Sequence, residues 1–220
     1  MKDKEKEVID KILFYALLNK RAFLEERGSE SEIEEFLNSP FVYSFREFKD
    51  EEFGEIFSLP PLKWNTDDLK KGFWISERIG VLLWGIKLID VVPPFDTPFD
   101  LNLIDEKLSH LMSRKTSESF SIRNRRELVK FFELADLFEW RSGMYIMKKE
   151  NVSPPPPYTY ESMFNMIMDK AFKTGIVERN EWGDIIVMGK PFAELTEKEF
   201  FNVAAIVKER KKAIEFLLEV

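Results

Sequence analysis

One segment of this 220-residue sequence constrains its fold more than any other: a helix-forming stretch that has no polar face. Asn65 or Thr66 can cap a helix, which we extend to Ile89. Its second half is apolar nearly all round, at Ile79, Val81, Leu82, Leu83, Trp84, Ile86, Leu88 and Ile89. A helix that is hydrophobic on every side is buried, and the apolar run is shorter than the roughly 20 residues that a bilayer span needs. The sequence therefore predicts a helical protein built around a central buried helix at about 66–89.

Helical periodicity and proline-marked loops account for most of the remaining sequence. We expect further helices at about 4–27, 30–38, 103–113, 122–149, 159–175 and 196–218, and one helical turn near 50–57. The segment from Asp184 to Met188 reads as a strand, and Gly189-Lys190 can turn the chain, which predicts a small β-hairpin at about 184–193. The expected fold is mainly α: residues 1–220 form a single helical domain, with a polyproline spacer at 153–157 inside it.

The composition excludes several classes of chemistry. The sequence has 0 Cys and a single His, His110, so thiolate metal sites, cysteine nucleophiles and multi-histidine metal sites are ruled out. The phosphate-binding patterns G-x-G-x-x-G and Walker A do not occur, and neither does the G-x-S-x-G pattern of hydrolases. We expect no cofactor and no bound metal, and we interpret helical carboxylates such as Glu133 and Asp136 as solvated faces.

Three ionisable residues, Glu77, Arg141 and Arg210, lie on apolar helical stripes, where an unpaired charge is costly. We therefore expect Glu77 to be buried and to contact Arg210, or failing that Arg141. The candidate network consists of Trp74, Glu77, Trp84, Trp140, Arg141, Glu209 and Arg210. Two interpretations stay open at this point: an ion pair that fixes the helix register, and a Glu77 carboxyl group that acts as a general acid or base in an aromatic pocket.

Charge is distributed unevenly along the chain, whose net charge is −7. The acidic segment 25–55 carries Glu25, Glu26, Glu30, Glu32, Glu34, Glu35, Glu47, Asp50, Glu51, Glu52 and Glu55, against the bases Arg27, Arg46 and Lys49. The same segment contains the aromatic residues Phe36, Phe41, Tyr43, Phe45, Phe48 and Phe53. Apolar anchors within a negative field favour a basic protein partner and disfavour nucleic acid. The alternative is that the aromatic residues pack the first helix onto the core and the acids only solubilise the surface.

Three segments, Trp74 to Phe95, Asp136 to Arg141 and Gly183 to Leu217, carry motifs that resemble a bacterial family, domain of unknown function 4272. Trp74-Ile-Ser-Glu77 followed by VLLWGIKLIDVVPPF resembles its W-x-x-E … L-L-W-A-L-G … P-P core, and Asp136 to Arg141 (DLFEWR) is similar to its aromatic helix. GDIIVMGKPFAELTEKEF and the following IVKERKKAIEFL resemble its C-terminal motif, in which Lys211, Glu215 and Phe216 replace His, Asn and Trp. The resemblance implies one intracellular domain that includes both sides of the polyproline spacer, and it implies no activity.

These features predict a non-catalytic intracellular protein-interaction module. Residues 1–10 mix acids and bases, whereas a signal peptide has a basic start followed by an apolar run, so we expect a cytoplasmic protein without a membrane segment. The alternative function is an enzyme that uses Glu77 as its general acid or base. A deep cleft that reaches Glu77 between Trp74 and Trp84 would favour the enzyme, and a closed core would favour the interaction module.

Overall fold

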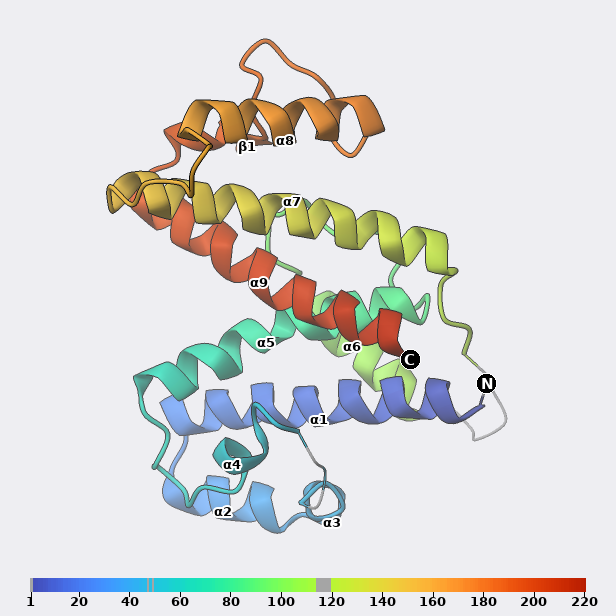
Figure 1. Ribbon diagram of the computed structural model, residues 1–220. Helices are drawn as coiled ribbons and strands as arrows, with labels where there is room; N and C mark the ends of the chain where they lie inside the picture. Colours follow the sequence, from blue (N-terminus) through green and yellow to red (C-terminus); the bar gives the residue numbers. More distant parts are fainter. Residues whose placement is uncertain (1, 47, 49, 114–119) are drawn as a thin grey trace. The chain divides into compact units, whose positions relative to one another are not determined.

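The computed structural model describes residues 2–46, 48, 50–113 and 120–220, and its described part is mainly helical, with a small antiparallel hairpin near the C-terminus (Figure 1). This confirms the predicted fold class. The chain divides into two compact units: unit 1 comprises 1–92, 99–122 and residue 220, and unit 2 comprises 93–98 and 123–219. The polyproline spacer lies inside unit 2, so it does not separate the units. The single domain that would include both units stays a prediction.

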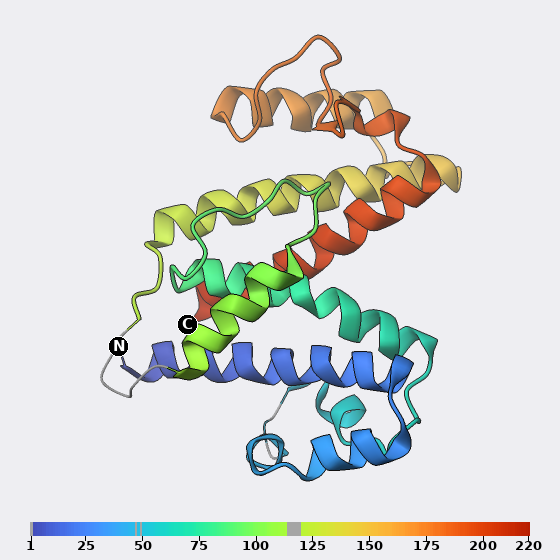
Figure 2. The same cartoon turned by 180° about the vertical axis from the view of Figure 1, so that it is seen from behind.

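Unit 1 consists of helices: α1 (Lys2–Arg27), α2 (Glu30–Asn38), α3 (Pro40–Tyr43), α4 (Gly54–Phe57), α5 (Thr66–Gly85) and α6 (Leu101–Ser113). Helix α5 is the expected central helix, since every residue from Ile75 to Gly85 is buried. Helix α1 packs along α5, and α2 contacts α1 (Figure 1, Figure 2). Within the described residues, no helix combines the length and apolar character that crossing a membrane requires.

Capping residues fix where the helices of unit 1 begin. Ser29 and Glu32 form a capping box at the start of α2, and Asn65 forms one with Asp68 at the start of α5. Helix α3 was not predicted; Pro40 occupies its first turn, directly after the N-cap Ser39. Proline suits this position because an N–H group in the first turn has no acceptor within the helix, so its absence removes no helical hydrogen bond.

The predicted end of the central helix was wrong, because α5 ends at Gly85 and not at Ile89. Lys87 adopts a left-handed conformation with a φ of 63°. Its N–H donates to the carbonyl of Trp84, and the N–H of Leu88 donates to the carbonyl of Leu83. This pair of bonds is a Schellman motif, which satisfies carbonyls of the last turn. Hydrophobicity could not reveal the stop, since Ile89 is still buried after the helix has ended.

Helices α1 and α5 approach each other closely at Gly72. A Cβ atom added to Gly72 would lie 2.5 Å from the Cβ of Ala22 and 2.8 Å from Cζ3 of Trp64. Both distances are shorter than a normal van der Waals contact between carbon atoms. The absence of a side chain at Gly72 therefore sets the separation of the two helices.

We expect Gly72→Ala to lower the free energy of unfolding by about 1–3 kcal/mol, because the added methyl group overpacks this contact. The matched control is Gly143→Ala in the second unit, where an added Cβ meets no atom within 4 Å. The control should stabilise the protein by up to about 1 kcal/mol through helix propensity. Urea unfolding followed by circular dichroism measures both effects, and equal effects would contradict the close approach.

Unit 2 contains helices α7 (Arg125–Lys149), α8 (Tyr160–Thr174) and α9 (Glu197–Glu219), strands β1 (Ile186–Val187) and β2 (Lys190–Pro191), and the 3₁₀ helix η1 (Phe192–Glu194). Helix α7 packs along α9 and contacts α8. The hairpin is shorter than the predicted 184–193, and its turn is formed by Met188 and Gly189, not by Gly189 and Lys190. Both turn residues have positive φ angles, of 54° and 74°, as a two-residue hairpin turn of the primed type requires.

Helix α9 begins at a capping box formed by Thr196 and Glu199. The backbone N–H and the hydroxyl group of Thr196 both donate to Oε2 of Glu199, and so does Nζ of Lys190, at 2.7 Å. These donors, Lys190 first, lower the pKa of Glu199 from 4.5 to about 2. Because the folded pKa lies below the unfolded one, the ionised carboxylate contributes stability above the unfolded pKa, and this contribution is lost as the pH falls through the folded pKa.

We expect the melting temperature of the wild-type protein to exceed that of Glu199→Gln by a constant margin above about pH 5.5. The margin should shrink below that pH and vanish only as the pH falls well below about 2, where the folded wild type also carries a neutral side chain. Thermal unfolding across this pH range measures it. Glu133→Gln, which changes an exposed carboxylate on α7, should show no such margin. A margin that grows as the pH falls would contradict the assigned bonds.

Candidate functional site

Glu77 is buried, as predicted, with an exposed fraction of 1% in the middle of α5. Its Oε1 accepts a hydrogen bond of 2.9 Å from the backbone N–H of Phe99. Phe99 directly follows the proline-rich loop 93–98, so the carboxylate fixes the point at which the chain re-enters unit 1. The buried backbone partner fits a structural carboxylate, whereas the enzyme alternative needs a substrate that reaches this side chain.

Arg210, on α9, is fully buried and also binds the proline-rich loop. Its guanidinium group donates to three carbonyl groups of the loop, those of Pro93, Pro94 and Thr97. Because proline has no N–H and the loop has no regular structure, its carbonyl groups take donors from elsewhere, here from a buried guanidinium group. Glu77 thus binds the backbone of Phe99 in unit 1, and Arg210 binds the backbone of the loop 93–98 in unit 2. The direct contact between the two side chains stays a prediction.

Arg141, on α7, forms a buried ion pair with Asp184. Nε of Arg141 donates to Oδ1 at 2.7 Å, and Nη2 donates to Oδ2 at 2.8 Å. Asp184 also accepts bonds from the backbone N–H groups of Ile185 and Ala193. One carboxylate therefore accepts four hydrogen bonds and ties the hairpin to α7. Sequence reasoning missed Asp184 as a partner, although an acid beside the apolar run IIV could have been paired with the buried arginine.

The seven predicted network residues are divided between the two units. Trp74, Glu77 and Trp84 lie on α5 in unit 1, and Trp140, Arg141, Glu209 and Arg210 lie in unit 2. Trp140 stacks on Phe164 of α8 at 6.4 Å between ring centroids, and Glu209 is buried on α9. The assembly of all seven into one pocket stays a prediction.

We expect Glu77→Gln to lower the free energy of unfolding by about 1–3 kcal/mol, because it removes a charge whose hydrogen bonds are buried. The amide still has an acceptor oxygen for the N–H of Phe99, so the loss should stay below that of a truncation. Glu55→Gln, at an exposed position of the same unit, is the matched control and should change stability by less than about 0.5 kcal/mol. Guanidinium unfolding compares the two, and equal stabilities would contradict the structural role of Glu77.

Part of the acidic segment faces inward and neutralises cations of unit 1. The ion pairs are Glu25 with Arg21, Asp50 with Lys11, and Glu52 with Arg78. Arg21 and Arg78 are buried. Neither arginine was predicted to be buried, although Leu17 and Leu24 place Arg21 on an apolar stripe of α1. These three acids therefore belong to the fold and are not available to a partner.

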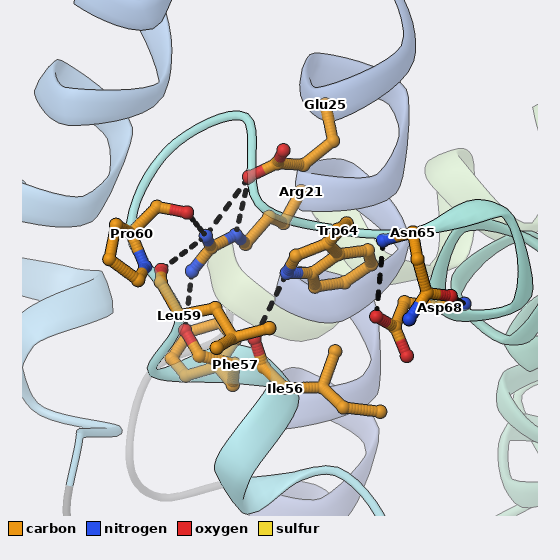
Figure 3. A network of polar contacts seen from close by, with 9 residues as sticks. All are labelled: Arg21, Glu25, Ile56, Phe57, Leu59, Pro60, Trp64, Asn65 and Asp68. Atoms are coloured by element: carbon orange, nitrogen blue, oxygen red, sulfur yellow. Dashed lines mark hydrogen bonds and ion pairs between the residues drawn. The ribbon is translucent and has the colours of Figure 1, made fainter.

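The Arg21 cluster fixes the irregular segment before α5 (Figure 3). Its guanidinium group donates to the carbonyl groups of Phe57, Leu59 and Pro60, and to Oε1 of Glu25 at 3.0 Å. The guanidinium carbon lies 5.3 Å from the ring centroid of Trp64, whose indole N–H donates to the carbonyl of Ile56 at 2.9 Å. A single arginine of α1 thus satisfies a loop that has no regular hydrogen bonding of its own.

Other acids of the segment face solvent, and so do two of its aromatic residues. Phe41 and Tyr43 of α3 have exposed fractions of 43% and 63%. The exposed carboxylates are Glu26, Glu30, Glu32, Glu34, Glu35, Glu51 and Glu55. Within the described part of the chain, Glu30, Glu34, Glu35, Glu51 and Glu55 have no ion-pair partner. We call these five acids together with Phe41 and Tyr43 the acidic surface.

The predicted set of aromatic anchors is only partly exposed. Phe45 and Phe53 are buried, so for them the alternative of packing within the unit is correct. Phe36 and Phe48 are half-buried, whereas Glu47 and Lys49 lie outside the described residues. A cavity of about 320 Å³ beside α3 is lined by Leu37, Val42, Arg46, Phe57, Ser58, Leu59 and Pro60. Of the predicted anchors, Phe41 and Tyr43 are therefore the exposed ones among the described residues.

No group of three or more histidine and carboxylate side chains in the described residues is placed to hold a metal ion. Comparison of the chain with family models, with curated proteins and with solved structures finds no match. Membership of the domain of unknown function 4272 family therefore stays a prediction.

Proposed function

We propose that this protein is a non-catalytic cytoplasmic interaction module that binds a basic protein partner through the acidic surface. The observation that carries the proposal is that one segment exposes both Phe41 and Tyr43 and five carboxylates, Glu30, Glu34, Glu35, Glu51 and Glu55, that have no ion-pair partner in the described residues. Large aromatic side chains dominate the energy of protein interfaces when a partner covers them. Unpaired carboxylates around them attract a basic partner and raise its association rate.

The local structure keeps these aromatic side chains available. Helix α3 is a single turn, held by the N-cap Ser39 and by the buried Val42. Arg46 lies 4.7 Å from the ring centroid of Tyr43 and donates to the carbonyl of Leu37, which restrains one face of the ring. A restrained aromatic side chain loses less conformational entropy on binding than a free one.

A non-catalytic role is supported by the use of the buried charges. Glu77 and Arg210 bind loop backbone, and Arg141 binds Asp184, so each has a structural partner. The cytoplasm is supported by the absence of cysteine, since small secreted domains commonly depend on disulfides. The three quoted segments support membership of the domain of unknown function 4272 family, which we include in the proposal.

A photo-cross-linking amino acid at position 43 tests the site directly. We expect illumination in native extract to attach a basic protein at position 43. The same amino acid at position 201 is the control, because Phe201 is an exposed aromatic residue of unit 2. Identical adducts at both positions, or adducts with acidic proteins only, would contradict the proposal.

Neutralisation of the acids tests the steering effect once the cross-linked protein is purified. We expect Glu34→Gln combined with Glu35→Gln to slow its association several-fold at low salt, and the difference to shrink above about 0.15 M salt, where the screening length is about 8 Å. Glu178→Gln with Glu181→Gln removes the same charge from exposed positions of unit 2. Stopped-flow association rates that are equal for both double variants would contradict steering by the acidic surface.

A further inference from the structure

Unit 2 contains a cleft that the proposed function does not use. It has a volume of about 480 Å³ and lies among α7, α8 and the hairpin. We call this cleft the aromatic cleft, because its apolar lining includes Tyr160, Phe164 and Trp182, together with Met144, Pro191 and Ala193. Trp182 has an exposed fraction of 51%, so an aromatic face of the cleft is open to solvent. Ligand sites commonly have this size and this aromatic character.

A smaller cavity of about 250 Å³ adjoins the aromatic cleft and is cationic. The two share Arg141, Lys148 and Ala193 as lining residues, and the smaller one adds Tyr145 and Lys149. Every charged residue that lines the smaller cavity is a cation. Lys149 is paired with Glu197 at 2.8 Å. Lys148 has no ion pair within the described residues.

Arg141 lines both cavities, and its hydrogen bonding indicates that a ligand binds there. Its exposed fraction is only 6%, and Asp184 uses its Nε and Nη2. Among the described residues, nothing accepts a hydrogen bond from Nη1 of Arg141. Its guanidinium carbon lies 5.2 Å and 4.9 Å from the ring centroids of Phe164 and Phe192, which hold the group in place. The N–H groups of Nη1 are therefore buried, held in a fixed orientation and able to donate to an acceptor that is not part of the chain.

We infer that this double cavity binds a small aromatic monocarboxylate. Its carboxylate would accept hydrogen bonds from the free edge of Arg141, because the guanidinium fork matches two coplanar oxygen atoms. Lys148 adds a second positive charge, and Asp184 cannot compete because four donors already occupy it. The aromatic body of the ligand packs against Tyr160, Phe164 and Trp182.

The charge of the lining favours a monoanion over a phosphate dianion. Glu161 and Glu194 also line the aromatic cleft, and neither has an ion pair in the described part of the chain. Their charges repel a second negative charge on the ligand. A ligand with one carboxylate and a neutral aromatic body can place its charge in the smaller, cationic cavity and its apolar part against the rings of the aromatic cleft.

Calorimetric titration of the full chain with indole-3-propionate tests the inference, and indole-3-propionamide is the matched ligand without charge. We expect the carboxylate to bind at least tenfold more tightly than the amide. Equal affinities, or no heat of binding for the carboxylate at millimolar concentration, would overturn the inference. Displacement of the carboxylate by an equal concentration of inorganic phosphate would also overturn it.

Two substitutions at exposed positions locate the binding site without disturbing the buried ion pair. Lys148→Met and Trp182→Ala should each weaken binding of indole-3-propionate about tenfold. The matched controls are Lys208→Met on α9 and Phe201→Ala, which change an exposed lysine and an exposed aromatic residue outside both cavities. They should leave the affinity within twofold of the wild type. Affinities that are equal in all four variants would place the ligand elsewhere and overturn the inference.

Discussion

Replacement of Arg21 by methionine is expected to lower the free energy of unfolding by about 3–5 kcal/mol. Methionine preserves much of the apolar volume but donates no hydrogen bond. The substitution therefore leaves the carbonyl groups of Phe57, Leu59 and Pro60 without their buried donor, and it leaves Glu25, whose side chain is 2% exposed, without a counter-charge. Urea unfolding of the full chain, followed by tryptophan fluorescence, measures the loss.

Two further variants separate the charge effect from the loss of a long side chain. Arg27→Met removes a solvent-exposed arginine from the end of the same helix and should cost less than about 0.5 kcal/mol. Arg21→Met combined with Glu25→Leu should recover part of the loss, since no buried carboxylate is then left unpaired. If Arg21→Met alone is as stable as Arg27→Met, the hydrogen bonds and the ion pair of Arg21 contribute little to the fold.

Asp184→Asn is expected to destabilise unit 2 by a similar amount, about 3–5 kcal/mol, although the two side chains have nearly the same shape. An amide can accept bonds only through its oxygen atom, so its NH₂ group faces two of the four donors that the carboxylate satisfies. The buried guanidinium group of Arg141 also loses its counter-charge. Chemical unfolding monitored by circular dichroism measures the change.

Hydrogen exchange distinguishes a local effect on the hairpin from a general loss of stability. In Asp184→Asn the amides of Ile185 and Ala193 should exchange much faster than in the wild type, because both donate to Asp184. The control Asp169→Asn removes an exposed ion pair with Arg179 and should cost less than about 0.5 kcal/mol. Unchanged protection of these two amides would contradict the assigned role of Asp184.

The sequence was sufficient to predict most helix boundaries, since the signals that set them are local. Ser29, Thr159 and Thr196 begin helices through hydrogen bonds to residues within the next turn. Gly175 ends α8 in the left-handed conformation that glycine adopts without a steric penalty. The end of α5 escaped prediction because Lys87 takes that role in place of glycine, and tertiary contacts keep the following residues buried.

The burial of Glu77, Arg141 and Arg210 was also predictable, because a helical period places each of them on an apolar stripe. The partners that the structure shows for these three side chains were not predictable. Phe99 and the loop 93–98 are far from α5 and α9 in sequence, and a backbone N–H or carbonyl group has no signature in the residue type. The same limit applies to Asp184, whose identity suggests a turn as readily as an ion pair.

The sequence by itself determined a mainly α fold, a buried central helix, a C-terminal hairpin and the absence of cysteine-based or multi-histidine chemistry. Only the tertiary structure decided which acids of the segment 25–55 face inward, which of its aromatic residues remain exposed, and that α7, α8 and the hairpin enclose a cleft. The physical reason is the range of the interactions involved. Caps, turns and periodic burial act within a few residues, whereas a buried charge is stabilised by whichever polar group packing brings to it.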